Sequence, residues 1–152
     1  MREAIRELLA REDVALLVTS AACGADLLGL EAAEELGVRV RIVLPFDVDR
    51  FRQQSVTDRG ERWGLIFDHL VGRAAARGDL IVREHPEGVD AFAENNREVL
   101  IEAEAAGAGR GVAILVWDGE ATGPEDATAD LARRAEVAGF VRRDVSPLEL
   151  LP

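Results

Sequence analysis

Residues 14–26 read Val-Ala-Leu-Leu-Val-Thr-Ser-Ala-Ala-Cys-Gly-Ala-Asp. The first part, 14–19, is a continuous apolar run, which is typical of a strand buried on both faces of a parallel sheet. Small residues follow, and an amphipathic segment begins at Ala25. A buried strand that leads through a small-residue turn into a helix leaves backbone N–H groups unpaired at the helix start. Those donors and the helix dipole favour an anion there, most often the phosphate of a nucleotide.

The rest of the chain continues this alternation of strand and helix. The segments with a helical pattern are 2–11, 25–36, 61–76, 87–106 and 126–138, with a helical turn at 48–54. The segments with a strand pattern are 14–19, 38–44, 79–83, 112–117 and 140–145. Such alternation implies right-handed crossovers and a parallel sheet. The sequence therefore predicts an α/β chain, a single Rossmann-like domain over 1–152. It would be a three-layer sandwich, with about five mostly parallel strands in one sheet and helices on both faces.

Two of the predicted helices carry a marked apolar stripe. In 61–76 the stripe consists of Trp63, Ile66, Phe67, Leu70, Val71 and Ala74. In 87–106 it consists of Val89, Phe92, Ala93, Asn96, Leu100 and Ala103. The pattern therefore predicts that Asn96 faces the interior, where an amide needs hydrogen-bond partners.

Composition excludes several classes of protein. The 18 basic and 29 acidic residues give a net charge of −11, which argues against a nucleic-acid surface. The single cysteine, Cys23, excludes an internal disulfide and a cysteine-based zinc site. No apolar run approaches the ~20 residues of a membrane span, and the charged N-terminus is unlike a signal peptide. We expect a cytoplasmic protein with no metal site, because neither His69 nor His85 has a partner at metal-ligand spacing.

In an open parallel sheet, ligands bind beyond the carboxyl ends of the strands, and four segments fall there. In the first, 20–26, small residues let a ligand approach the backbone or let helix and strand pack tightly. The second is 44–47, where Pro45 fixes the exit of the chain and Phe46 either flanks a base or fills the core. The first segment lacks both the six-residue glycine fingerprint of dinucleotide domains and the lysine of a P-loop.

The other two segments carry polar side chains. In 95–97, Asn96 either holds a ligand hydroxyl or caps a loop, and Arg97 either meets a phosphate or pairs with an acid. In 117–130 a strand ends, a glycine-containing loop follows, and a new helix begins. Asp118, at the strand tip, either accepts hydrogen bonds from a ribose or forms the turn.

Five short motifs in this order resemble the SLOG superfamily, the Rossmannoid nucleotide-sensing and nucleotide-processing domains related to the DNA-processing-A and LOG proteins. The motifs are Gly24-Ala25-Asp26, Leu44-Pro45-Phe46, Asn96-Arg97, Trp117-Asp118-Gly119 and Thr128-Ala129-Asp130. The resemblance covers nearly the whole chain from residue 14 onward and is closest to a bacterial branch. It implies a nucleotide ligand, with no further cofactor.

The resemblance also implies where that ligand binds. The expected residues are Ala22, Cys23, Gly24 and Asp26 at the phosphate, Pro45 and Phe46 beside the base or sugar, Asn96 and Arg97 across the cleft, Asp118 and Gly119 at the ribose, and Thr128 at the start of the last helix.

The chain departs from the family pattern in two places. The family has a strand ahead of the helix at 2–11, so this strand is either lost or belongs to a longer chain. Its absence removes one wall of the pocket and leaves a sheet edge open to another chain. At the last helix start the family has glycines, whereas this chain has Glu125 and Asp126. Carboxylates there would occupy the N–H donors and repel a phosphate.

We expect a non-catalytic module that binds or senses a nucleotide or nucleotide derivative and signals to a partner or fused effector. A homodimer is the other expected assembly. Two alternatives stay open. One is a LOG-like hydrolase of the N-glycosidic bond in a nucleoside monophosphate, although the Pro-Gly-Gly-x-Gly-Thr-x-x-Glu motif of those enzymes is absent. The other is a degenerate interaction domain that binds no ligand.

Overall fold

The computed structural model describes residues 1–107 and 109–147. The helices are α1 (Arg2–Arg11), α2 (Ala25–Leu36), α3 (Val48–Ser55), α4 (Glu61–Ala76), α5 (Val89–Ala106) and α6 (Ala127–Val137), with the short 3-10 helix η1 (Thr57–Arg59). The strands are β1 (Leu16–Thr19), β2 (Arg39–Leu44), β3 (Leu80–Val82), β4 (Val112–Val116) and β5 (Val141–Val145). Each predicted helix and strand is present, and its ends lie within two residues of the prediction; η1 was not predicted.

The strands are parallel, but they form two sheets. In the first sheet β2 lies between β1 and β3, with Leu17 opposite Val40 and Val43 opposite Ile81. In the second sheet β4 pairs with β5, and Ile114 lies opposite Arg143. The α/β class is confirmed, whereas the prediction of one continuous sheet is wrong. The pairing is interrupted between β1 and β4, the neighbouring edges of the two sheets.

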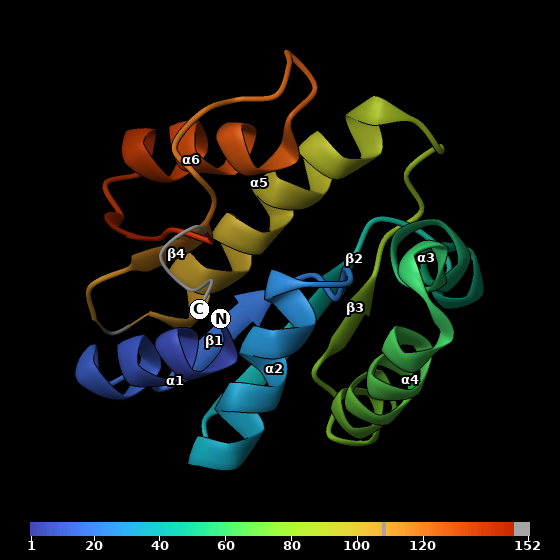
Figure 1. The fold of residues 1–152 in the computed structure, drawn as a ribbon, viewed down its shortest axis with the longest axis horizontal. Helices are drawn as coiled ribbons and strands as arrows, with labels where there is room; N and C mark the ends of the chain where they lie inside the picture. Colours follow the sequence, from blue (N-terminus) through green and yellow to red (C-terminus); the bar gives the residue numbers. More distant parts are fainter. Residues whose placement is uncertain (108, 148–152) are drawn as a thin grey trace.

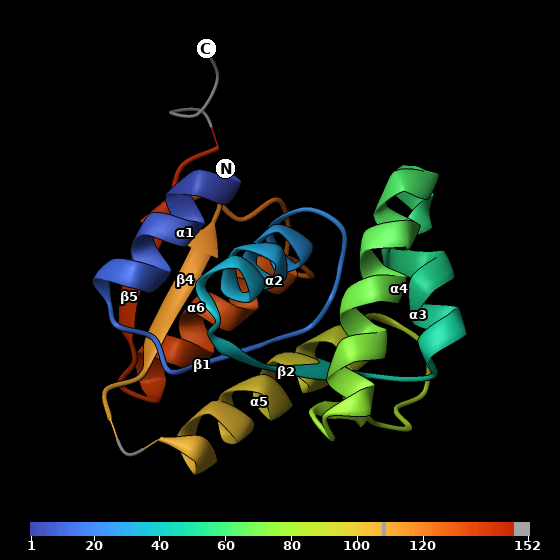
Figure 2. The same ribbon diagram turned by 90° about the horizontal axis from the view of Figure 1, so that it is seen from below.

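Helices cover both sides of the strands. Figure 1 shows α5 and α6 along one side and α1 and α2 along the other, with α3 and α4 beyond β3. Figure 2 shows the same layers from below, with α5 on the side of the strands away from α1, α2 and α4. Gly37 ends α2 in the left-handed conformation at φ 70°, as its position after the apolar pattern predicts. Within the described residues, no helix is long and apolar enough to cross a membrane.

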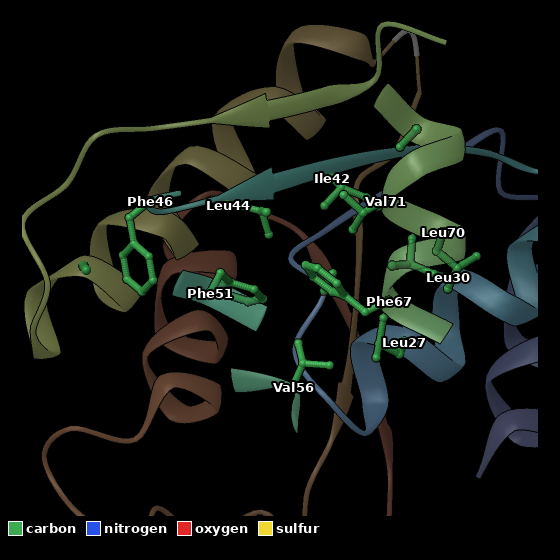
Figure 3. Packing of buried hydrophobic residues seen from close by; sticks show 13 residues of the cluster. Leu27, Leu30, Ile42, Leu44, Phe46, Phe51, Val56, Phe67, Leu70 and Val71 are labelled. Carbon is green, nitrogen blue, oxygen red and sulfur yellow. The ribbon is translucent and has the colours of Figure 1, made fainter. Parts of the chain in front are cut away.

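The larger hydrophobic core lies between the first sheet and the helices α2, α3 and α4 (Figure 3). Phe51 and Phe67 stack with their ring centroids 6.1 Å apart, and Ile42 and Leu44 of β2 pack in the same cluster. The predicted stripe of α4 is confirmed. Its buried members are Phe67, Leu70, Val71 and Ala74, and its partly buried members are Trp63 and Ile66.

A smaller core joins the two sheets. Ile5 and Leu9 of α1 are buried against Ala32 and Ala33 of α2. Partly buried side chains of both sheets pack on this cluster, among them Leu17, Val40, Ile114 and Val116. The helix α1 therefore contacts both sheets across the interruption between β1 and β4.

Candidate functional site

A cavity of about 1010 Å³ lies between β1 and β4. Side chains of α5 and α6 line it, and the turn at 20–26 closes the end where the strands finish. Its apolar lining includes Leu9, Leu17, Val18, Val99, Leu100, Ile114 and Leu131. Its polar lining includes Thr19, Ser20, Asp26, Asn95, Asn96 and Thr128. Because Thr19 and Ser20 are at the carboxyl end of β1, the cavity coincides with the place where parallel sheets bind ligands.

The carboxylate of Asp26 lies at the start of α2 and closes the turn. Its Oδ2 accepts hydrogen bonds from the Ser20 hydroxyl and from the Ala22 N–H, the latter at 3.2 Å. Burial raises the pKa of Asp26 by disfavouring its charged form, and the bonds from Ser20 and Ala22 oppose that effect. Asp26 therefore places an acceptor, and not a cation, at the helix start where a phosphate was expected.

Two backbone donors of this turn are already used inside the protein. The Ala22 N–H is bonded to Asp26, and the Cys23 N–H donates to the Ser55 carbonyl oxygen at 2.8 Å. Gly24 precedes α2 at φ 96°, and no side chain caps this helix. A Cβ placed on Gly24 would meet nothing within 4 Å, so the backbone is open to approach there. The backbone N–H groups in the first turn of α2 are therefore the donors that have no side-chain cap.

The second predicted segment belongs to the larger hydrophobic core. Pro45 is buried, and Phe46 is 3% exposed with its ring 6.1 Å from the rings of both Phe51 and Phe92. Neither Pro45 nor Phe46 lines the cavity. Of the two roles open to Phe46, filling the core is the one that the structure shows.

The fully buried amide of α5 belongs to Asn95, whereas Asn96, which the pattern placed on the inner face, is partly buried. Asn95 is 4% exposed, and its Nδ2 donates to the Val43 carbonyl oxygen at 3.0 Å. Its Oδ1 is buried and has no hydrogen-bond partner among the described residues. The inner face of α5 follows Ala91, Asn95 and Val99, which are spaced four residues apart and lie one position before the predicted stripe. The side chain of Val89, a member of that stripe, lies outside the described set.

Asn96 and Arg97 contact groups within the protein. The Nδ2 of Asn96 donates to the Ala127 carbonyl oxygen and to the Asp130 carboxylate, both at 2.9 Å. Asn96 lines the cavity and also holds α5 against the start of α6. The exposed guanidinium of Arg97 lies 3.7 Å from a Glu94 oxygen, and Arg97 does not line the cavity.

The start of α6 is occupied by its own carboxylate. Asp126 Oδ1 accepts from the N–H groups of Thr128 at 2.9 Å and Ala129 at 3.0 Å. Its Oδ2 accepts from the N–H and the hydroxyl of Thr122, both at 2.9 Å. The backbone N–H of Thr122, followed by that of Ala129, lowers the pKa of Asp126. The prediction that a carboxylate takes these donors is confirmed for Asp126, whereas Glu125 is exposed.

The loop after β4 shows a turn at Asp118 and Gly119. Asp118 accepts from the Glu120 N–H at 3.0 Å, and Gly119 adopts φ 89°. Both residues are exposed, and neither lines the cavity. Of the predicted binding residues, those that the structure brings to the cavity are Ala22, Cys23, Asp26, Asn96 and Thr128.

Reasoning from the sequence missed Ser20 and Asn95. Ser20 directly follows the apolar strand, which was a usable signal. Asn95 stands four residues after Ala91 and four before Val99, a spacing that also marks an inner helix face. His69 lies on the exposed side of α4, with Nε2 3.2 Å from Glu34. Within residues 1–107 and 109–147, no group of three histidine, cysteine or acidic side chains is arranged to hold a metal ion.

No family model matches this chain, and no curated protein matches it either.

Proposed function

We propose that this chain binds a nucleotide-derived ligand at the polar end of the cavity between β1 and β4, and that it acts as a non-catalytic sensor. The observation that carries this proposal is the side chain of Asn95 in the cavity wall. Its Oδ1 has no hydrogen-bond partner in the described part of the chain and is buried from solvent, so a ligand would reach it once the side chain turns toward the cavity. An unsatisfied buried acceptor costs about 1–3 kcal/mol, so a ligand that donates a hydrogen bond to the turned side chain gains affinity.

Asp26 supports the same class of ligand. Its carboxylate lies in the cavity wall and, like Asn95 Oδ1, offers an acceptor. Hydroxyl groups of a ribose and the exocyclic amine of a base donate hydrogen bonds, whereas a phosphate does not. We therefore place the nucleoside part of the ligand at Asp26 and Asn95, and any phosphate beside the uncapped first turn of α2.

The sensor role is preferred to hydrolysis because the Pro-Gly-Gly-x-Gly-Thr-x-x-Glu motif of the LOG enzymes is absent from the sequence. Without that motif, the chain lacks the glutamate that serves the glycosidic-bond chemistry in those enzymes. The resemblance to the SLOG domains adds support for a nucleotide ligand and for signalling to a partner or effector.

The test is a thermal-shift titration with adenosine, adenosine monophosphate and inorganic phosphate. A tenfold excess of ligand over its Kd should stabilise the protein by about 1.4 kcal/mol. We expect adenosine and its monophosphate to raise the Tm, and Asp26→Ala to abolish that shift. Arg97→Ala is the matched control, because Arg97 is exposed and lies outside the cavity.

Three results would contradict the proposal. A flat Tm with all three compounds would leave the cavity without a nucleotide ligand. A shift with phosphate equal to that with adenosine monophosphate would indicate an anion site in place of a nucleoside site. Release of free adenine during incubation would favour the hydrolase.

A further inference from the structure

The cavity runs along two unpaired strand edges. Each residue of β1 and each residue of β4 lines it, so it follows both strands from end to end. Among the described residues, β1 is hydrogen-bonded to β2 alone and β4 to β5 alone. A strand that pairs on one side leaves backbone N–H and C=O groups without partners on the other. Two such rows face the same space.

The two edges run in the same direction. A second, smaller cavity is lined by Thr19 at the end of β1 and by Val116 at the end of β4, together with Ile5 of α1. The carboxyl ends of β1 and β4 therefore lie at the same end of the gap. Figure 2 shows the amino end of α1 beside the arrowhead of β4, so α1 begins at that end as well.

The two walls of the gap are apolar. On the α1 side Leu9 lines it, and on the α5 and α6 side Val99, Leu100 and Leu131 do. A segment lying between β1 and β4 would thus meet hydrophobic side chains above and below. A central strand in a parallel sheet has the same surroundings, because it carries apolar residues on both faces.

We propose that the gap between β1 and β4 is a docking groove for one extended β-strand of apolar residues, supplied by a partner polypeptide and running parallel to both edges. The incoming strand would join the three-stranded and two-stranded sheets into one sheet of six strands. A five-residue strand is about 17 Å long and matches the length of β4. This proposal does not depend on the nucleotide site, which occupies the polar end of the cavity.

The backbone edges favour a peptide over a small apolar molecule. A peptide strand offers N–H and C=O groups to both neighbours at the usual strand spacing of about 4.8 Å, whereas a hydrocarbon would leave both rows unpaired. The described strands of a second copy are all paired in their own sheets, so a separate polypeptide is the better donor. The net charge of −11 favours a partner with basic residues beside its apolar strand.

The first test uses a synthetic peptide of five valine and isoleucine residues, with two lysines at each end. A matched peptide carries proline at its central position, which removes one backbone donor. Hydrogen exchange is followed at residues 16–19 and 112–116. We expect the first peptide to slow exchange in both segments at least tenfold and the proline peptide to leave both unchanged. Slowing in one segment alone, slowing with both peptides, or no slowing would overturn the proposal.

The second test joins the same strand to the chain ahead of Met1 through a short glycine-rich turn. Because α1 begins at the carboxyl end of the gap, the tethered strand can run parallel to β1 and β4. We expect a higher Tm than for the tethered proline version, since tethering gives a millimolar effective concentration. Equal Tm values would contradict the proposal. A dimer of the unmodified chain in sedimentation, with both edges protected, would make a second copy the occupant and would overturn it too.

Discussion

At the start of α2 a partly buried carboxylate has no cation against it. The Ser20 hydroxyl and the Ala22 N–H donate to Asp26, Thr19 also lowers its pKa through a hydrogen bond, and none of the influences on its pKa comes from a basic side chain. Asp68 is the opposite case, because the Arg52 guanidinium bonds it at 2.8 and 2.9 Å and lowers its pKa. The same chemical group is thus disfavoured as an anion at one position and favoured at the other.

Replacing Asp26 by asparagine keeps the shape of the side chain and removes its charge. Since the pKa of Asp26 is raised on folding, its contribution to stability is fully present below the ordinary aspartate pKa and declines as the pH rises through the folded value. We expect Asp26→Asn to gain stability relative to the wild type as the pH rises from 3 to 8. Urea unfolding across this range measures it.

Asp68→Asn serves as the control with the opposite sign. The pKa of Asp68 is lowered on folding, so the wild type gains stability above the ordinary aspartate pKa and loses it on acidification. Relative to the wild type, this variant should lose stability as the pH rises. Parallel pH profiles for the two variants would show that the buried position of Asp26 has no electrostatic consequence.

The identity of the buried amide shows where prediction at single residues fails. Asn95 and Asn96 are adjacent, and both lie near the inner face of α5. Turning the helix by one residue, about 100°, exchanges their surroundings, and the apolar pattern around them is too even to fix that angle. The turn at 20–26 was identified. That the Cys23 N–H donates to Ser55 depends on a segment far away in the sequence, whereas Asp26 takes the Ala22 N–H from within the turn.

Elements were predicted well because their signals are local. The ends of α2 follow from small residues before Ala25 and from Gly37 after the helix, and the stripe of α4 follows from a period of 3.6. The pairing of strands is not local. Whether β1 and β4 pair depends on which segments come together in space, and the apolar pattern of a single strand does not show this.

The cap of α6 gives a prediction for one element. Asp126 bonds two N–H groups of the helix start and two groups of Thr122. Asp126→Ala should lower the free energy of unfolding by about 1 kcal/mol, the usual cost of losing such a cap. Chemical denaturation measures the change. Glu125→Ala is the neighbouring control and should leave stability unaltered, because Glu125 is exposed. Equal losses in both variants would show that capping is not the cause.

Glu12 links α1 to the second sheet. Its carboxylate follows α1 and bonds Arg110, ahead of β4, at 2.7 Å and Arg143, in β5, at 2.6 Å. The hydrogen bond from Arg143 is the largest influence that lowers the pKa of Glu12, and the charges of Arg143 and Arg110 add to it. The ion pairs therefore fasten the carboxyl end of α1 to the second sheet.

Glu12→Gln should reduce stability with a distinct pH dependence. A lowered pKa means that the stabilisation is present above the ordinary glutamate pKa and is lost as the pH falls through the folded value. The difference in Tm between wild type and variant should thus be largest near neutral pH and should vanish on acidification. Glu3→Gln is the control, because Glu3 is exposed and bonds only Arg6 on its own helix among the described residues. A constant difference at all pH values would contradict the ionic role.

The whole molecule consists of two small parallel sheets held together by helices. β2 is paired on both sides, whereas β1 and β4 are paired on one side each within the described residues. Alternate residues of a strand bond to opposite neighbours, so about half of the amides in β1 and β4 lack a strand partner while those of β2 have one. Local opening should therefore be easier in β1 and β4 than in β2.

Hydrogen exchange of the free protein tests this distribution. We expect the amides of β2 to exchange slowest, near the rate set by global unfolding, and alternate amides of β1 and β4 to exchange much faster. Strand β5 is a matched comparison for β4, since it also pairs on one side in the described structure. The residues of β5 itself do not border the gap, although Phe140, just before the strand, does. Fast exchange in β4 with slow exchange in β5 would place the opening at the gap itself. Uniformly slow exchange in β1, β2 and β4 would contradict this prediction and would mean that the two edges are already paired in the free protein.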